Sequence, residues 1–142
     1  VECVALRKPP GHGLRIYPQF RRLLALHRPA VVHTRNLSPL ELQVVAAWAR
    51  VPARIHGEHG RDVEDLDGTR RKYQWVRRAY APFVHRYVAL SRDLAGYLTD
   101  RVGIGADRVS QIYNGVDARR FQPRPVRGRP EVPGLPFGGP DH

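Results

Sequence analysis

The 142-residue chain has a single cysteine, Cys3, and no apolar run that approaches the roughly 20 residues needed to cross a bilayer. One cysteine excludes an internal disulfide framework and a cysteine-based zinc site, so a reducing, cytoplasmic compartment is expected. The N-terminus also lacks the charged-then-apolar layout of a signal peptide. We therefore expect a chain that neither is exported nor spans a membrane by itself.

Lysine is scarce as well, since Lys8 and Lys72 are the only two, yet arginine raises the formal net charge to +11. A balance this basic usually indicates nucleic acid, an anionic membrane surface or phosphorylated ligands as partners, and composition does not choose among them. The arginines are spread along the chain, and a compositional habit of the source organism accounts for part of the charge. The length and the hydrophobic share of 42% favour one soluble globular domain.

Apolar runs and helical stripes alternate along the chain. The pattern predicts strands at residues 1–6, 30–34, 53–56, 87–90 and 109–113, and helices at 16–28, 38–50, 69–80 and 91–102. Ser38, Pro39 and Glu41 match an N-cap, a first-turn proline and a capping-box glutamate, Ser91 matches an N-cap, and Gly103 a C′ residue. This alternation predicts an α/β fold with a mostly parallel sheet covered on both faces.

Proline and glycine dominate from Gln122 onward. We therefore expect a domain at residues 1–121 and a linker or disordered tail at residues 122–142. A doubly wound domain that binds phosphate normally opens with a strand and a glycine-rich turn, and no G-x-G-x-x-G follows a strand here. The chain is therefore expected to begin in mid-domain.

The segment from Arg54 to Asp62 predicts an active-site loop, because a buried strand ends there in ionisable groups and glycines. His56, Glu58, His59 and Asp62 supply proton-transfer and hydrogen-bonding groups, and the glycines at positions 57 and 60 let the backbone bend and approach a ligand. Ligands of open α/β sheets gather at this carboxyl edge. A solvated loop in which one histidine caps a helix is the alternative.

Five motifs follow one another along the chain. They are V-V-H-T-R-N at 31–36, I-H-G-E-H-G-R-D-V at 55–63, D-L-D-G at 65–68, Y-V-A-L-S at 87–91 and I-Y-N-G-V-D at 112–117 with Phe121. In this order and spacing they resemble the N-terminal domain of family 4 glycosyltransferases, most closely the bacterial sugar transferases of exosortase-type exopolysaccharide loci. The resemblance covers about Val1 to Pro123.

The resemblance implies a GT-B architecture, in which two Rossmann-like domains pass a sugar from a nucleotide-diphosphate donor to a glycan or lipid-linked acceptor. It also implies a retaining, metal-independent reaction without a cofactor, the nucleotide sugar being a co-substrate. The family holds the donor mainly through a C-terminal domain and a glycine-rich loop, which have no counterpart here. A fragment or truncated product, inactive alone, is therefore expected.

The resemblance also transfers roles to single residues. His59 matches the family's histidine beside the reacting sugar, and we expect it to be the catalytic residue. Glu58, Gly60 and Arg61 would shape the same loop and bind substrate there, and Asn36 would line the acceptor side. Asn114 and Gly115 would lead into the interdomain hinge, although a plain strand-exit turn explains them equally well.

Two segments resemble metal-binding motifs only weakly. Asp65-Leu66-Asp67 matches the D-x-D of the other main glycosyltransferase fold, but a turn that ends in Gly68 suffices to explain it. His56 and His59 lack the i, i+4 spacing of a helical zinc motif, so no metal is expected.

A rival prediction is a nucleic-acid-binding module on the basic helix from Arg70 to Arg78, with Tyr73, Trp75 and Tyr80 available for stacking, although zinc-finger and RNP-like patterns are absent. A third prediction is that this helix lies at an anionic membrane surface, on the inner face of the cell membrane near a lipid-linked acceptor.

Overall fold

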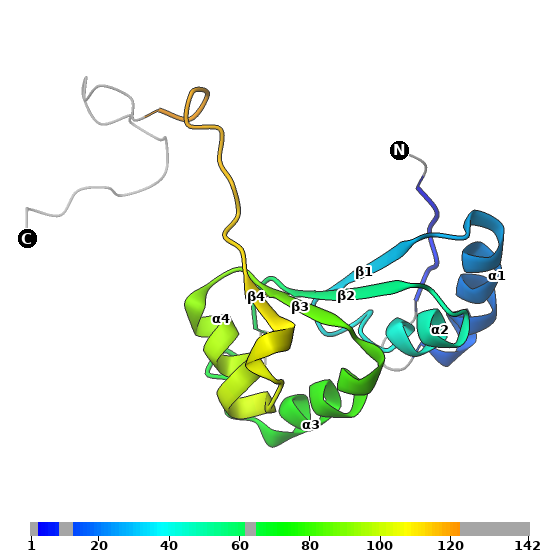
Figure 1. The fold of residues 1–142 in the computed structure, drawn as a ribbon, viewed down its shortest axis with the longest axis horizontal. Coiled ribbons are helices and arrows are strands. Elements are labelled where there is room, and N and C mark those ends of the chain that lie inside the picture. The colour runs from blue at the N-terminus through cyan, green and yellow to red at the C-terminus, as the bar shows by residue number, and fades with distance from the viewer. Residues whose placement is uncertain (1–2, 9–12, 62–64, 123–142) are drawn as a thin grey trace, which may run out of the picture.

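The computed structural model of the chain describes residues 3–8, 13–61 and 65–122, and it has an α/β fold (Figure 1). Its strands form one parallel sheet in the order β1-β2-β3-β4, with bounds Val31–Arg35, Ala53–Glu58, Arg86–Ala89 and Val109–Gln111. The α-helices are α1 (Tyr17–His27), α2 (Leu42–Trp48), α3 (Arg71–Tyr80) and α4 (Arg92–Gly96). The α/β class and the parallel sheet are thus confirmed.

Short helical turns complete the described part. The 3₁₀ turns are η1 (Leu14–Ile16), η3 (Ala81–Phe83) and η5 (Ala106–Arg108), and a π-helical segment, η4 (Tyr97–Val102), continues α4. None of the helices in the described ranges is long and apolar enough to cross a membrane.

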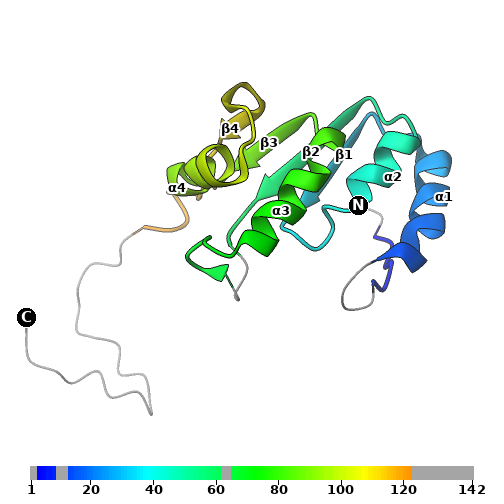
Figure 2. The same ribbon diagram turned by 90° about the horizontal axis from the view of Figure 1, so that it is seen from below.

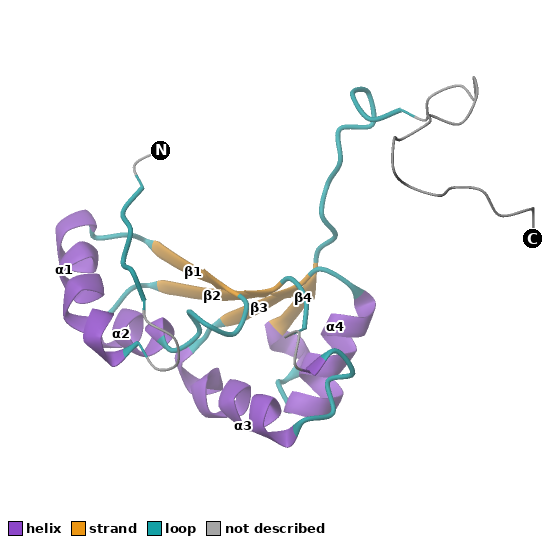
Figure 3. Cartoon of the chain, turned by 180° about the vertical axis from the view of Figure 1, so that it is seen from behind, coloured by secondary structure: helices purple, strands orange, loops and turns teal. Residues whose placement is uncertain are grey.

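All four α-helices lie on one face of the sheet (Figures 2 and 3). Consecutive strands are neighbours, and right-handed crossovers between such strands bring every connecting helix to the same side. Covering the second face requires a reversal of strand order, which the described strands do not show. The expectation of helices on both faces is therefore not met in the described ranges, and Val31, His33 and Arg35 are exposed on the uncovered face.

The core consists of two clusters between the sheet and the helices. One cluster packs Tyr87 of β3 against Leu98 of η4, and the other packs Val32 of β1 between Leu24 of α1 and Val45 of α2. Alternate residues of each strand face the helices, so the period-2 pattern of β1 decides which side chains enter the core.

The predicted ends of the fourth helix are confirmed. The Ser91 hydroxyl accepts a hydrogen bond from the Leu94 backbone N–H at 3.1 Å, as an N-cap should. Gly103 has φ 82°, the left-handed conformation for which glycine is favoured after a helix.

The predicted capping box at Ser38 and Glu41 is wrong. Helix α2 begins at Leu42, and Glu41 provides no side-chain cap. Its Oε1 instead accepts the backbone N–H of Gly13 at 2.8 Å and lies 3.3 Å from Lys8 Nζ. A tertiary partner with a positive charge thus outcompetes the local capping contact.

Predictions for both ends of the chain differ from the structure. Residues 3–8 form no strand and Cys3 is exposed, because an apolar run becomes a strand only where a ladder partner is available. Asn114 and Gly115 lie in an exposed segment without a turn, which leaves the sheet after β4 (Figure 1). The predicted tail at 122–142 lies outside the described residues except for Gln122.

Candidate active site

The carboxyl ends of β1 and β2 bring the first candidate residues together. Arg35 pairs with Gly57 in the parallel register, and the Asn36 backbone N–H donates to the Gly57 carbonyl at 2.9 Å. Strand β2 is two residues longer than predicted and ends at Glu58, so His59 is the first residue beyond it. Asn36 and His59 therefore follow neighbouring strands at the same edge of the sheet.

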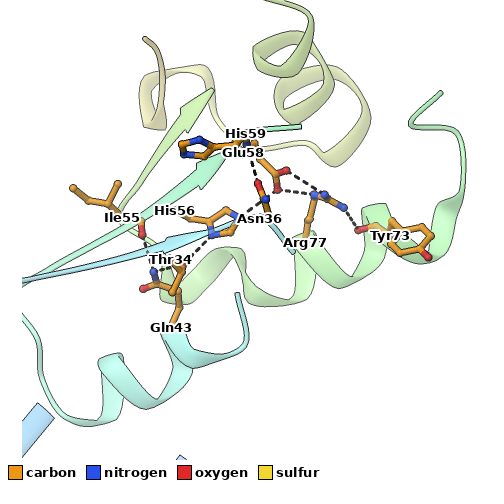
Figure 4. Close-up of polar contacts among 9 residues, drawn as sticks. All are labelled: Thr34, Asn36, Gln43, Ile55, His56, Glu58, His59, Tyr73 and Arg77. Atoms are coloured by element: carbon orange, nitrogen blue, oxygen red, sulfur yellow. Dashed lines mark hydrogen bonds and ion pairs between the residues drawn. The ribbon is translucent and has the colours of Figure 1, made fainter. Parts of the chain in front are cut away.

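His59 is held by two contacts from the end of β1. Asn36 Oδ1 accepts the His59 backbone N–H at 3.1 Å, and Arg35 Nη2 lies 2.9 Å from His59 Nδ1 (Figure 4 shows the Asn36 contact). A guanidinium can only donate, so Nδ1 must be the acceptor. A neutral His59 in this arrangement carries its proton on Nε2.

The Nε2 atom of His59 is buried and has no hydrogen-bond partner among the described residues. It lies over Gly57, beside the ring of His33, whose centroid is 6.4 Å from that of His59. A Cβ at position 57 would stand 2.7 Å from His59 Nε2 and 2.8 Å from His33 Nε2. Gly57 is thus needed for the close approach of two rings to strand β2, whereas the sequence predicted a sharp bend.

The surroundings favour the neutral form of both histidines. Burial, followed by the charge of Arg35, lowers the pKa of His59 from its ordinary 6.5, although the charge of Glu58 acts in the opposite direction. Burial and then the neighbouring His59 lower the pKa of His33. At neutral pH His59 therefore offers an Nε2–H donor and not a positive charge.

Glu58 does not face the same side as His59, so its side chain does not line the edge at which Asn36 and His59 lie. Its side chain is fully buried under the sheet, where Arg77 Nε donates to Oε1 at 2.7 Å and Arg77 Nη2 to Oε2 at 3.1 Å (Figure 4). Burial raises the pKa of Glu58, but hydrogen bonds from His56 and Arg77 outweigh it and leave the pKa below 4.5. Strand alternation explains the outcome, because neighbours in β2 point to opposite faces.

A buried polar chain continues from Glu58 to α2 (Figure 4). His56 Nε2 lies 3.3 Å from Glu58 Oε1, and His56 Nδ1 lies 2.8 Å from Thr34 Oγ1. Gln43 Nε2 donates to Thr34 Oγ1 at 2.7 Å and to the Ile55 carbonyl at 2.8 Å. The chain ties β1, β2, α2 and α3 together, so His56 has a structural role and is not available to a ligand.

Arg61, three residues after the end of β2, contacts residues farther along the chain. Its Nη1 donates to the Leu66 carbonyl at 2.8 Å, and its Nη2 lies 2.9 and 2.8 Å from the two carboxylate oxygens of Asp93. The guanidinium also lies 5.5 Å from the centre of the Tyr97 ring. Gly60, one residue earlier, has open space where a side chain would be. All of these Arg61 contacts are with the protein itself, and a substrate-binding role for Arg61 stays a prediction.

The remaining candidates are not assembled at this edge. No hydrogen bond joins Asn114 to the other candidate residues within the described ranges, and Gly115 has nothing within 4 Å of a Cβ. Asp65 is buried and accepts the Arg70 backbone N–H at 2.9 Å, and the Gly68 N–H bonds to its carbonyl, which supports the turn interpretation over D-x-D. Asp62 lies outside the described residues.

No group of three histidine, cysteine, aspartate or glutamate side chains suited to a metal ion occurs in the described ranges. The sequence prediction missed His33 and Arg35, which belong to the same constellation as His59. Both lie at alternate positions of β1, with Val32 and Thr34 between them facing the core. That alternation was the available signal.

Comparison with known proteins agrees with the geometry. The sequence profile described as Glycosyltransferase Family 4 matches residues 2–120, which is most of the chain. No curated protein matches the chain significantly. The extent of the profile match shows that the chain belongs to glycosyltransferase family 4 and is a transferase domain, and its parallel α/β sheet is consistent with that family.

Proposed function

We propose that this chain forms the acceptor-side half of a GT-B transferase that moves a sugar from a nucleotide-diphosphate donor to a glycan or lipid-linked acceptor. The observation that carries the proposal is the arrangement of His59. Its backbone is held by Asn36, its Nδ1 by Arg35, and its buried Nε2–H lacks a partner among the described residues.

A buried N–H without a hydrogen-bond partner is unfavourable, so an oxygen that takes this hydrogen bond is favoured. A small rotation of the His59 ring would present the N–H to a sugar hydroxyl or to a leaving-group oxygen. Sugar transfer needs the leaving diphosphate stabilised and the acceptor hydroxyl held in line, which is mainly positioning and electrostatics. A neutral His59, whose Nε2–H is a hydrogen-bond donor in one fixed tautomer, suits that role.

The finer properties follow the family resemblance. The reaction is retaining, uses no metal or cofactor, and belongs to polysaccharide biosynthesis of the exosortase-associated type. Residues 1–121 form the domain, and the donor is held mainly by a second domain. Residues 1–121 alone then position an acceptor without turnover. The protein works in the cytoplasm, at the inner face of the cell membrane, and does not bind nucleic acid.

The test measures the rate of sugar transfer by the transferase that contains this chain. The donors carry a label in the sugar, and the acceptor comes from a lipid extract. Replacing His59 with alanine is expected to lower the rate by roughly 10²–10³-fold, the usual effect of removing one positioned donor.

His85 provides a matched control, because its Nε2 also contacts an arginine, Arg54 Nη2, at 2.6 Å, and burial also lowers its pKa. It precedes β3 and therefore lies at the opposite edge of the sheet. His85→Ala should retain transfer. Equal rates for the wild type and His59→Ala would contradict the proposal.

A further inference from the structure

A groove runs between α1 and α2, which pack side by side on the same face of the sheet (Figures 1 and 2). Two open hollows of about 450 and 650 Å³ share Arg21, Ala25 and Trp48 in their walls, so they form one surface, here named the α1–α2 groove. Every charged residue that lines it is an arginine. These are Arg21, Arg22, Arg28 and Arg50.

The four guanidiniums of the groove are exposed, and none makes a hydrogen bond or an ion pair with another part of the chain that the structure describes. No carboxylate lines either hollow. Four positive charges without a counter-ion repel one another across a shared surface, and an anionic partner would relieve that repulsion.

The basic helix α3 differs from the groove, because most of its cationic side chains contact other groups of the chain. Arg77 is buried in its ion pair with Glu58, and Arg78 donates to the Val102 carbonyl at 2.7 Å while its guanidinium lies 5.2 Å from the centre of the Trp75 ring. Lys72 lies 5.9 Å from the centre of the Tyr73 ring. Helix α3 was predicted from the sequence to contact an anionic surface, but most of its cationic side chains already have partners within the protein.

The positions of the groove arginines are not explained by helix electrostatics alone. Arg28 and Arg50 follow the C-terminal ends of α1 and α2, where a positive charge complements the helix dipole. Both have left-handed backbones, with φ 42° and 57°, where glycine would be less strained. Arg21 and Arg22 lie inside α1, where the dipole gives them no such advantage.

Exposed apolar side chains accompany the arginines. Trp48, in the wall of both hollows, is 67% exposed, and Leu26, one turn after Arg22 on α1, is 74% exposed. Arginine together with exposed tryptophan and leucine is the composition of surfaces that lie in the headgroup region of a bilayer. We propose that the α1–α2 groove docks the protein on an anionic lipid surface, with its arginines on the phosphates and Trp48 and Leu26 at the acyl boundary.

The groove lies away from the candidate active site. The larger hollow includes Pro29 and Val51, which precede β1 and β2, whereas His59 follows β2 at the opposite edge. Docking there leaves the carboxyl edge open to substrates. The inference deepens the proposed function, because it names the surface behind the membrane location proposed there. Its test needs no sugar transfer, so a failure to bind vesicles is distinguishable from a failure to transfer sugar.

The experiment is sedimentation of the full chain with vesicles of phosphatidylcholine alone or mixed with phosphatidylglycerol. The chain should pellet only with the anionic vesicles. The variant R21E/R22E should lose at least about tenfold in partitioning, because each arginine near an anionic surface contributes several-fold.

The matched control is R71E/K72E on α3, which changes the net charge by the same amount on exposed residues. It should retain most of the binding. Circular dichroism of both variants confirms that they are folded.

Tryptophan fluorescence gives an independent readout, because Trp48 and Trp75 are the only two tryptophans of the chain. With anionic vesicles, the emission of the W75F variant, which retains Trp48, should shift to the blue. The emission of W48F should not shift.

The inference is overturned if wild-type chain stays in the supernatant, if both charge-reversed variants lose binding equally, or if Trp75 reports the contact. It is also overturned if the chain ignores the vesicles but binds a soluble polyanion, such as polyphosphate or RNA, through the groove.

Discussion

Arg35 Nη2 donates to His59 Nδ1 across 2.9 Å, from the last residue of β1 to the first residue after β2. The contact joins residues 24 positions apart in sequence, and the parallel register of the two strands makes it possible. It determines which ring nitrogen of His59 carries the proton, and thus which chemistry the ring offers at the edge of the sheet.

Replacing Arg35 with methionine should therefore change the protonation of His59 without unfolding the chain. In the wild type, long-range ¹H–¹⁵N NMR should show the Nε2–H tautomer and a pKa below 6.5. In Arg35→Met the pKa should rise towards 6.5, because one of its lowering causes is gone, and the tautomers should mix. Arg22→Met, an exposed arginine on α1, is the control. An unchanged His59 spectrum in Arg35→Met would contradict the role given to the contact.

Replacing Gly57 with alanine should displace the rings of His33 and His59, because the new methyl group would lie within 2.8 Å of both Nε2 atoms. The rings can move, so the effect on stability should be small while the histidine chemical shifts and any transfer activity change strongly. Gly60→Ala, with open space where its Cβ would stand, should leave the chemical shifts of His33 and His59 unchanged. If the two variants behave alike, Gly57 is not needed for the approach of the rings.

Replacing Arg77 with methionine should destabilise the fold by about 3–5 kcal/mol, because it leaves the Glu58 carboxylate buried without its partner. Urea denaturation measures this loss. The double variant Arg77→Met with Glu58→Gln should recover part of it, since the buried charge is then removed. Arg71→Met, an exposed site on the same helix, should change stability by no more than about 0.5 kcal/mol. A wild-type midpoint for Arg77→Met would show that the pair is not structural.

The free energy of unfolding should fall as the pH drops below 6.5. His33, His59 and His85 have pKa values below 6.5 in the folded chain, so between their folded values and 6.5 the unfolded chain binds more protons. Below 4.5 the fall should continue, because the pKa of Glu58 is also lowered by folding and protonation removes its ion pair with Arg77. Denaturation at a series of pH values tests this. Stability that increases from pH 7 to pH 5 would contradict it.

Local patterns predicted the elements well. The helix and strand alternation, the Ser91 cap and the position of His59 after a buried strand all follow from apolar periodicity and turn residues. Glu58 and His59 were grouped because they are adjacent in sequence, but strand geometry places their side chains on opposite faces.

The parts that could not be predicted depend on long-range register. His33 and Arg35 join His59 only because β1 pairs with β2 in one particular alignment. Glu41 does not cap α2, because its carboxylate accepts the backbone N–H of Gly13, 28 residues away. The single-sided cover of the sheet depends on strand order, which periodicity within one segment does not encode.

An NMR titration of the full chain with nucleotide-diphosphate sugars, acceptor lipids and, separately, RNA tests whether the edge around His59 is a sugar-transfer site. A sugar nucleotide or acceptor lipid should shift the resonances of His59, His33 and Asn36, and the shifts should persist at high salt. Shifts confined to α3, caused by RNA and falling steeply with salt, would instead indicate a nucleic-acid-binding module and contradict the assignment of the site.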